Sequence, residues 1–564
     1  MNNYNNYLES IRYWILKKEL SPLISLIISF IITISWSFYL FPLSYMLGNG
    51  DFFETGDSVQ HLSGWYYFKN DSWHFPLLKT NLLDPPYGIN IAYTDSIPLA
   101  ALFFKLIKFI LSNEFNYFGI WSIFCIILQG ISATWVMRLI GEKRLIPLII
   151  INYLFITYPA LSLRMQMQHT SLYTQGLIII AFGIIIAGLK QIYSEKKSEW
   201  AFRILMIISL LIHPYFLAMI SVLYLGFRGE ILLRDKNFKS FNFNIFYSFF
   251  LIFLFMLFMG YFGNGNPNTS GFGYYSMNIS SLFCGGSILL PNCNIDGTGG
   301  QYEGNNYLGC GVIALCVFTL FFKKTWVKEK IKSFPILFVT LILLAVYSVA
   351  KNIYIGHLIF LSLPFPDFFI TKIFRSNGRF FWPIGQIILF TVFIALLKVK
   401  NQKLALSFSL VILFIQLSDL KGIINADRAF ARGNDPLFIK RLKKWDPLFQ
   451  NISLVRILPS ASCGGDPKQV LFFQFVSSKK NKPFIGAYVA HGGINENCDS
   501  WKHLRLKEKE LDILLNPQLK IGLPLELSKE VRNGQCRKFS EGLVCVKNSN
   551  SKWWQNYAPW MNKL

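Results

Sequence analysis

Apolar residues in this chain come in long uninterrupted blocks, separated by shorter polar and basic stretches. A membrane-spanning helix needs about 20 consecutive apolar residues. The blocks that meet or approach this length are 23–47, 117–139, 146–158, 172–189, 204–227, 246–262, 308–322, 334–350, 380–397 and 405–417. The block 204–227 is interrupted by His213-Pro214, so it is expected to form two short helices or one kinked helix. The pattern therefore predicts an all-α polytopic membrane domain with about 11 spans.

The lysines and arginines indicate which side of the membrane each loop faces, because positively charged loops are retained in the cytoplasm during insertion. They cluster at 12–18 and again between alternate blocks, at 138–144, 190–203, 228–239, 323–332 and 398–403. The loop 263–304 contains none of the chain's 55 Lys and Arg residues and is expected outside. The first block has no small-residue cleavage site, so a retained anchor is expected rather than a signal peptide.

The segment 97–111 is apolar but short, and it carries Lys105 and Lys108. It is predicted to be an interfacial helix, because counting it as a span would reverse the sidedness of every later loop.

The resulting organisation has three parts. Residues 1–21 form a cytoplasmic N-terminus, and 22–420 form the membrane domain, with outer loops at 48–116, 161–171, 263–304 and 351–378. Residues 421–564 are expected to form a small extracytoplasmic α/β domain with strands at 454–458, 470–476, 483–489 and 542–546 and a helix at 502–515.

Composition and charge agree with a membrane protein. The chain is 53% hydrophobic and carries a formal charge of +24. Much of that charge lies in the loops assigned to the cytoplasm, where it faces anionic lipid. No nucleic-acid-binding motif accompanies it, so no nucleic acid partner is expected.

The nine cysteines divide by location. Three fall in or beside spans and are expected to be buried: Cys125, Cys310 and Cys316. Six fall outside, where disulfides persist. Spacing favours Cys284 with Cys293 and Cys536 with Cys545, which leaves Cys463 with Cys498, although six cysteines leave many pairings open. A metal site is the alternative, but no C-x-x-C and no adjacent histidine support it.

Polar residues without a solubility role gather in the first outer loop. Glu54 and Asp57 follow the first span, and Asp57, Gln60, His61 and Gly64 would share one helix face. Asp95 precedes the interfacial helix. Simpler roles remain open, since either aspartate could cap a helix and Glu54 could be a solvated carboxylate.

The later outer loops add cationic side chains. The second supplies Arg164 and His169, and the fourth ends in F-R-S-N-G-R-F-F-W, with Arg375 and Arg379. Guanidinium groups bind phosphate with a two-pronged fork, but two arginines four residues apart could also reach lipid phosphates from the surface. The third loop ends in G-Q-Y-E-G-N-N-Y-L-G, where Glu303 lies at a membrane boundary, a costly place for an unused carboxyl group.

These features together resemble membrane glycosyltransferases of the GT-C architecture: a first span ending in an acidic outer loop, an interfacial helix, and a second outer loop with Arg and His. The blocks G-D-S-V-Q-H-L-S-G-W-Y-Y-F, Y-T-D-S-I-P-L, G-Q-Y-E-G-N-N-Y-L-G and F-R-S-N-G-R-F-F-W also resemble a bacterial membrane-protein family within that superfamily. The likeness covers about residues 20–420. The first loop has no Asp-x-Asp or Asp-Glu pair, so a requirement for a divalent cation, Mg²⁺ or Mn²⁺, stays open.

The resemblance implies an enzyme of the bacterial inner membrane. It would transfer a sugar from a polyprenyl-phosphate-linked donor to an envelope glycan or lipid acceptor on the extracytoplasmic side, in contact with membrane lipid. The implied catalytic carboxylates are Asp57, Asp95 and Glu54. The implied donor-binding and phosphate-binding residues are Gln60, His61, Arg164, His169, Arg375 and Arg379. The implied substrate-binding residues are Trp65, Tyr66, Tyr302, Glu303 and Trp382.

Two other classes of function remain open. A lipid or glycan transporter would show ionisable residues in the middle of its spans or an internal repeat, and these spans are almost free of such residues. A non-catalytic envelope-assembly protein would need neither Asp57 nor the arginines.

The assigned topology predicts the outcome of cysteine labelling. Single cysteines introduced into 263–304 and into the C-terminal domain should react with a membrane-impermeant maleimide added to intact cells, whereas a cysteine at Lys239 should react only after permeabilisation. Labelling of the C-terminal domain only after permeabilisation would overturn this topology.

Overall fold

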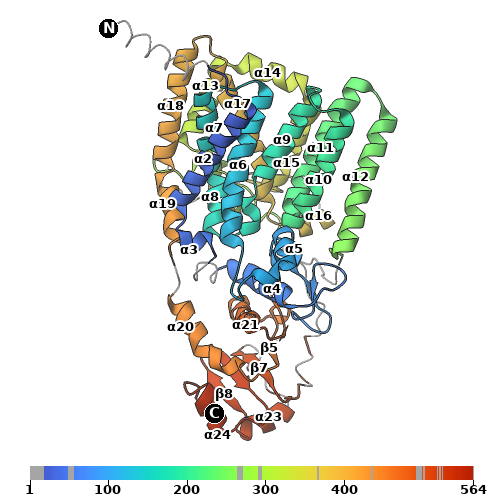
Figure 1. Cartoon of the computed structure of the whole chain (residues 1–564), viewed down its shortest axis with the longest axis vertical. Coiled ribbons are helices and arrows are strands. Elements are labelled where there is room, and N and C mark those ends of the chain that lie inside the picture. The colour runs from blue at the N-terminus through green and yellow to red at the C-terminus, as the bar shows by residue number, and fades with distance from the viewer. Residues whose placement is uncertain are drawn as a thin grey trace. The chain divides into compact units, whose positions relative to one another are not determined.

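The structure is a computed structural model that describes residues 18–48, 56–262, 271–289, 295–364, 368–433, 436–490, 498–499, 502, 504–516, 519, 523 and 525–562. The chain divides into two compact units (Figure 1). The helical unit comprises Met1–Met46, Phe118–Phe253 and Thr269–Arg432. The mixed unit comprises Leu47–Tyr117, Leu254–Asn268 and Gly433–Leu564.

Helices make up most of the helical unit. In chain order these are α2 (Pro22–Leu40), α3 (Leu43–Met46), α6 (Phe118–Ile140), α7 (Leu145–Ile156), α8 (Pro159–Gln166), α9 (Gly176–Leu189), α10 (Glu195–Ile212), α11 (Pro214–Asp235), α12 (Phe238–Met259), α13 (Cys310–Phe322), α14 (Lys324–Ser333), α15 (Pro335–Val349), α16 (Phe369–Ile373), α17 (Trp382–Leu397), α18 (Gln402–Asp419) and α19 (Lys421–Phe430). A short hairpin, β3 (Asn352–Ile355) with β4 (Leu358–Ser362), follows α15. Single turns of 3-10 helix are η4 (Thr170–Tyr173), η5 (Ile279–Phe283), η6 (Gln301–Gly304) and η7 (Asn377–Phe381).

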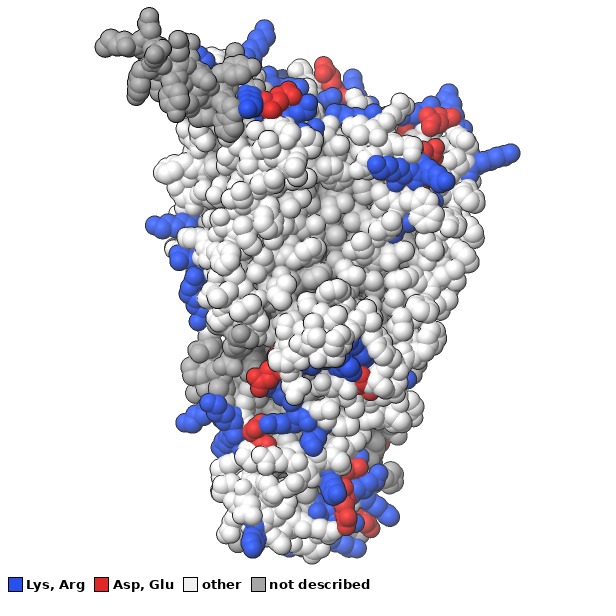
Figure 2. Space-filling view, viewed as in Figure 1, with Lys and Arg blue, Asp and Glu red and all other residues white. Residues whose placement is uncertain are grey.

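Eight described helical segments are long and apolar enough to cross a membrane, or nine if α13 and α14, bent by 89°, form one span. Of the remaining predicted spans, α10 carries charged residues at its start and α15 has only 15 residues. The chain is therefore a multi-pass helical protein. Within the helical unit, Lys and Arg gather at the end where α14 lies, beside a broad uncharged band (Figure 2).

Helix α2 shows the inverted pattern expected of a helix in lipid. Its buried face is formed largely by hydroxyl side chains, whereas Leu23, Ile31 and Phe38 are exposed. On the buried face, Ser29 donates to the side-chain oxygen of Asn152 at 2.6 Å, and the Asn152 amide donates to Thr134 at 2.8 Å. Small and hydrogen-bonding residues of this kind hold helices together where the hydrophobic effect supplies no driving force.

The block interrupted by His213-Pro214 forms two separate helices, α10 and α11. His213 ends α10 and caps α11, since its Nδ1 accepts a hydrogen bond from the Tyr215 amide at 3.2 Å. Near the far end of α11, Arg228 Nη1 donates to Glu195 at the start of α10, at 2.7 Å. The two helices are therefore an antiparallel hairpin, which rules out the single kinked helix.

The mixed unit combines the first outer loop with the C-terminal domain. The loop contributes α4 (Ser58–Asn70), β1 (Lys79–Thr80), β2 (Ile89–Asn90), η2 (Ile91–Thr94), α5 (Pro98–Leu106) and η3 (Lys108–Ile110). The C-terminal segment contributes α20 (Pro436–Trp445), η8 (Asp446–Phe449), β5 (Leu454–Leu458), η9 (Ala461–Cys463), α21 (Pro467–Lys479), β6 (Phe484–Ile485), β7 (Glu510–Leu515), α23 (Leu525–Arg532), β8 (Cys536–Phe539), β9 (Gly542–Cys545) and α24 (Ser551–Tyr557). Strands β5 to β9 form one sheet in the order β6-β5-β7-β9-β8, in which β5 is parallel to both neighbours.

Helices α4 and α21 join these two stretches of chain. Tyr67 on α4 donates to the backbone oxygen of Gln474 at 3.2 Å, and the Gln474 side chain donates to Ser63 at 3.0 Å. The first outer loop therefore packs with the C-terminal domain, whereas the predicted boundary at 420 separated them. The predicted interfacial segment 97–111 forms α5 and η3, which are too short to span a membrane.

Two secondary-structure predictions for the C-terminal domain are wrong. Residues 470–476 form α21 rather than a strand, because the Asp466 side chain caps the helix, Pro467 favours its first turn, and the helix is buried against α4 and the sheet. Residues 510–515 form the central strand β7 rather than the end of a helix. Strands β5 and β9 pair with β7 on both sides and satisfy its backbone hydrogen bonds, and this pairing overrides the local helix propensity.

Two predicted disulfides are confirmed: Cys463–Cys498 and Cys536–Cys545. The second joins β8 to β9, which pair directly in the sheet. Cys293 lies outside the described residues, so the predicted pairing with Cys284 is not described. Cys125, Cys310 and Cys316 carry free thiols, and the expected burial is confirmed for Cys125, whereas Cys310 and Cys316 are half-buried.

A buried carboxyl group lies in the middle of the C-terminal sheet. Asp512 on β7 is completely buried, and Arg456 on β5 donates to its Oδ1 at 3.1 Å. Its Oδ2 has no hydrogen-bond partner among the described residues. Burial raises the pKa of Asp512 to about 7, because the attraction of Arg456 offsets only part of the desolvation and Glu510 opposes it.

This raised pKa predicts that the C-terminal sheet is less stable at high pH. The folded state holds a proton on Asp512 that the unfolded state has lost, so its stabilising effect is full below pH 3.8 and disappears as the pH rises through about 7. Hydrogen exchange of the β7 peptide in the full chain, corrected for intrinsic rates, should therefore show less protection at pH 8 than at pH 5. Asp512→Asn should remove this difference and the half-exposed control Asp446→Asn should keep it. A pH dependence that survives Asp512→Asn would contradict the assignment.

Candidate functional site

Three segments of the helical unit bring charged side chains to one buried point. Glu303 in η6 lies between Arg164, at the end of α8, and Arg379 in η7. Arg379 donates from Nε and Nη2 to Glu303 Oε2, at 3.0 and 2.8 Å. Arg164 Nη1 also donates to Oε2, and its Nη2 donates to the Glu303 backbone oxygen at 3.1 Å. His169 Nδ1 lies 3.9 Å from Oε1. We call these four residues the Glu303 cluster.

Two glycines let η6 and η7 approach closely enough to form the Glu303 cluster. A Cβ on Gly378 would lie 2.4 Å from the Gly304 Cα, and a Cβ on Gly304 would lie 2.4 Å from the Ser276 oxygen. The Asn306 side chain donates to the backbone oxygens of both glycines, at 2.9 and 3.1 Å. Asn377 fastens η7 to the end of α15 through Ser348 O, at 2.8 Å. The Gly and Asn residues of the third and fourth motif blocks thus position Glu303 and Arg379.

The Glu303 cluster is buried and carries more positive than negative charge. Arg164 is 1% exposed, Glu303 5% and Arg379 6%. Burial alone would raise the pKa of Glu303, but Arg164, Arg379 and His169 hold it well below its usual range. The carboxylate is therefore ionised, and two guanidinium groups share its single charge. The Arg164 Nε is buried and has no hydrogen-bond partner among the described residues. Such a centre attracts an anion.

Two aromatic rings pack on the arginines. The Arg164 guanidinium lies 5.9 Å from the Trp382 ring and that of Arg379 lies 5.0 Å from the Tyr215 ring. Trp382 is itself only 1% exposed. The structure therefore places Trp382 as a wall of the cluster; stacking on a sugar stays a prediction for this ring.

Beside the cluster lies a more exposed group, formed by Tyr302, Tyr275 and Arg375. Tyr302, next to Glu303, is 48% exposed, and its ring centroid lies 6.5 Å from that of Tyr275. The Arg375 guanidinium lies 5.9 Å from the Tyr275 ring and makes no hydrogen bond or ion pair with a described residue. Of the two arginines in the fourth loop, Arg379 thus holds the buried carboxylate, and Arg375 is the half-exposed cation near an aromatic surface.

A buried acid that the sequence did not single out lies against the opposite side of α8. Asp427 on α19 is 3% exposed and accepts a hydrogen bond from the Gln166 side chain at 2.7 Å. Burial raises the pKa of Asp427 to about 7, and the hydrogen bonds with the neutral side chains of Gln166 and Ser162 offset only part of this rise. Arg164 and Gln166 are two residues apart and so point to opposite sides of the helix. Helix α8 is therefore held by acids on both sides. The Gln166–Asp427 contact joins residues 261 positions apart, so no spacing in the sequence predicts it.

The remaining predicted site residues lie in the mixed unit. Asp57 is exposed at the N-cap position of α4 but makes no capping hydrogen bond. Asp95 is half-buried with a left-handed backbone (φ 53°) at the end of η2. It does not cap α5, because Ile97 occupies that N-cap position. Glu54 lies outside the described residues.

The first two motif blocks meet each other in the mixed unit. The Ser96 hydroxyl donates to the His61 backbone oxygen at 2.7 Å, and Gln60 donates to the Tyr93 oxygen at 3.4 Å. A Cβ on Gly64 would lie 2.0 Å from the Thr94 hydroxyl oxygen, so only glycine fits there. The predicted shared face of Asp57, Gln60, His61 and Gly64 is therefore used partly to join α4 to the Y-T-D-S-I-P-L segment.

The aromatic residues Trp65 and Tyr66 of α4 are also buried. Trp65 Nε1 donates to Phe115 O at 2.9 Å, and the Tyr66 hydroxyl donates to Glu114 O at 3.1 Å. Both rings are covered in the structure, so their predicted contact with a sugar stays a prediction. Among the described residues, no group of three or more His, Cys, Asp or Glu side chains is arranged to hold a metal ion.

The fold and the cluster define a multi-pass helical membrane protein that carries a buried, net-positive charge centre between its loops. The chain belongs to the family described as Domain of unknown function (DUF6311), whose profile matches residues 30–421. The matched range contains the whole Glu303 cluster and both motif blocks of the first outer loop, and it ends before the C-terminal sheet. No curated protein matches the chain.

Because Glu303 pairs with two buried arginines, we expect that removing its carboxylate strongly lowers the stability of the folded protein. Glu303→Gln leaves two buried guanidinium groups without a countercharge, which should cost about 3 to 5 kcal/mol. Thermal unfolding of the purified full chain should show a clearly lowered midpoint. Adding Arg379→Gln to this variant should restore part of the loss, because one uncompensated charge is removed with it.

The matched control for this experiment is Glu329→Gln on the exposed face of α14, which should leave the midpoint unchanged. Equal effects of the two glutamate substitutions would show that the buried ion pairs do not stabilise the fold.

Proposed function

We propose that this protein is a membrane glycosyltransferase that transfers a sugar from a polyprenyl-phosphate-linked donor to an envelope glycan or lipid acceptor on the extracytoplasmic side of a bacterial inner membrane. The observation that carries the proposal is the Glu303 cluster, in which Arg164 and Arg379 converge on one carboxylate and leave positive charge in surplus. Buried charge in a membrane protein is costly and marks a functional site by default.

The surplus charge fits the leaving group of the proposed reaction. When a sugar leaves its lipid phosphate, negative charge grows on the phosphate oxygens, and fixed cations stabilise that charge. Glu303 keeps Arg164 and Arg379 oriented, while Arg375 adds a half-exposed cation beside Tyr302 and Tyr275. These side chains would bind the donor phosphate and the sugar ring.

The proton of the acceptor hydroxyl needs a separate base. Glu303 is a poor candidate, because its neighbouring arginines keep its pKa low. Asp57 is exposed and keeps this role, and Asp95 is the second candidate. The resemblance to GT-C enzymes supports the assignment of Asp57, and the orientation of the membrane domain rests on the distribution of Lys and Arg.

The proposal predicts distinct defects for two substitutions, measured as transfer of labelled sugar in membranes with matched expression. Asp57→Asn keeps the side-chain shape but removes the base, so kcat should fall about 10²-fold or more. Arg379→Lys keeps the charge but loses the two-pronged contact with Glu303, so weaker donor binding and a higher KM should dominate.

The transfer assay tests both the assignment of the base and the choice between an enzyme and the transporter or assembly role. Transfer at the wild-type rate by Asp57→Asn would remove the base assignment and shift it to Asp95. Absence of transfer by the unmodified protein across a broad panel of lipid-linked donors would overturn the enzyme and favour the transporter or assembly role.

A further inference from the structure

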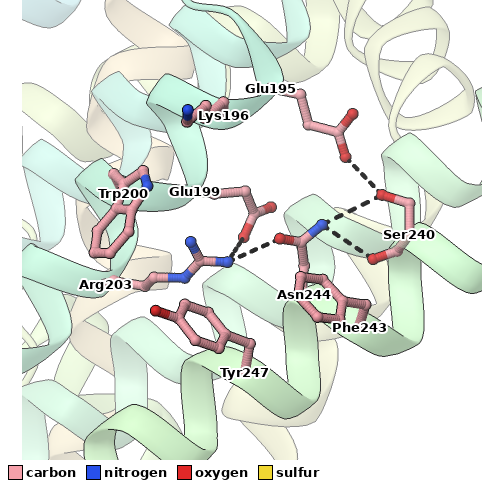
Figure 3. Close-up of a pocket in the computed structure, with 9 residues that line it drawn as sticks. All are labelled: Glu195, Lys196, Glu199, Trp200, Arg203, Ser240, Phe243, Asn244 and Tyr247. Atoms are coloured by element: carbon pink, nitrogen blue, oxygen red, sulfur yellow. Dashed lines mark hydrogen bonds and ion pairs between the residues drawn. The ribbon is translucent and has the colours of Figure 1, made fainter.

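A second charged site lies at the other end of the helical unit, where α10, α11 and α12 meet. A cavity of about 340 Å³ opens there between α10 and α12 (Figure 3). Its wall combines cations (Lys196 and Arg203), carboxylates (Glu195 and Glu199), hydrogen-bonding side chains (Ser240 and Asn244) and aromatic rings (Trp200, Phe243 and Tyr247). The Glu303 cluster contributes no residue to this wall, so the site is separate from the one proposed for catalysis.

The inner wall of the cavity is a buried and well-connected polar network. Glu199, 2% exposed, accepts from Arg228 at 2.9 Å, from Tyr224 at 2.6 Å and from Arg203 at 3.4 Å. Arg203 also donates to Asn244 on α12 at 2.8 Å. Both carboxylate oxygens of Glu199 are thus used inside the protein. The network fastens the first half of α12 to the α10–α11 hairpin.

The charged residues of the network and of the cavity wall together do not balance. Within the network, Glu195 and Glu199 match Arg203 and Arg228. Lys196 on the cavity wall adds one further positive charge. Lys196 is exposed, and its ammonium makes no hydrogen bond or ion pair with a described residue. Arg203 Nη1 likewise makes no hydrogen bond with a described residue. The cavity therefore offers donors and one surplus positive charge to an anion.

The rim of the cavity is aromatic. Trp200 is 42% exposed and Phe243 is 64% exposed, and Arg203 lies between the Trp200 and Tyr247 rings, at 5.1 and 4.6 Å. Aromatic side chains gather where lipid headgroups meet hydrocarbon. Further along α12, Phe246 and Phe250 are exposed, and their rings stack with centroids 5.8 Å apart. An anion in the cavity would thus have an apolar track leading from it.

We propose that this cavity binds the phosphate-bearing headgroup of an anionic phospholipid, with its acyl chains on the exposed phenylalanines of α12. Lys196 and Arg203 hold the phosphate, Trp200 and Phe243 cover the glycerol region, and Phe246 and Phe250 contact an acyl chain. The bound lipid completes the contact between α12 and the α10–α11 hairpin. A soluble phosphate compound has the same phosphate chemistry but lacks the acyl chain that Phe246 and Phe250 would contact.

The test is lipid retention by the purified full chain, measured by native mass spectrometry with phosphatidylglycerol as the probe. Lys196→Gln should weaken binding about three- to tenfold, because it removes one charge-assisted contact at an exposed position. Lys239→Gln, an exposed lysine at the same end that does not line the cavity, should bind as the wild type does. If both substitutions weakened lipid binding equally, the lipid would be held by nonspecific charge attraction and the proposed site would be wrong.

Two further arms test the source of the phosphate and the position of the lipid. Glycerol 3-phosphate and inorganic phosphate should fail to displace the lipid, and displacement at comparable concentrations would overturn the lipid assignment. A photoreactive phosphatidylglycerol should label peptides of α10 and α12 near Trp200 and Phe243, and Trp200→Ala should reduce that labelling. Labelling spread evenly over the other helices would also overturn the proposal.

Discussion

Many polar groups buried among the helices find their partners within the protein, because surrounding lipid offers none. This constraint governs the helical unit at every scale. Ser29, Asn152 and Thr134 join three helices through neutral hydrogen bonds. At one end of the unit Glu199 gathers Arg203 and Arg228, and elsewhere Glu303 gathers Arg164 and Arg379. In both charged sites one carboxylate orients two guanidinium groups. The surplus positive charge comes from the second arginine at Glu303 and from Lys196 beside Glu199.

The motif blocks also satisfy polar groups through contacts within the protein. The third and fourth blocks meet at Gly304 and Gly378, and the contact places Glu303 against Arg379. The first and second blocks meet at Gly64 and Ser96 in the mixed unit. Each pair uses glycine for close approach and a short polar side chain to bond the neighbouring backbone. Several motif residues therefore serve to bring segments together, and fewer of them present a reactive group.

Residues such as Trp65, Tyr66 and Trp382 show why residue type alone is a weak guide to a binding site. All three are aromatic, and all three are buried, with Trp382 packed on Arg164. An aromatic ring is equally suited to a sugar and to a protein core, because both offer apolar surface and hydrogen-bond partners. Tyr302 has similar chemistry but is half-exposed, and only the packing around it makes that difference.

The sequence by itself determined the class of protein, since runs of apolar residues and clustered lysines follow directly from the bilayer's thickness and from the rules of insertion. It also predicted a break at His213-Pro214, favoured the two disulfides of the C-terminal domain and indicated the candidate charged residues, because each depends on local chemistry. Only the tertiary structure decided that α21 is a helix, that β7 is a strand, and that Glu303 lies between two arginines while Asp427 is paired with the neutral side chain of Gln166. Those outcomes depend on contacts between residues far apart in the chain, and such contacts override local propensity and leave no spacing to read.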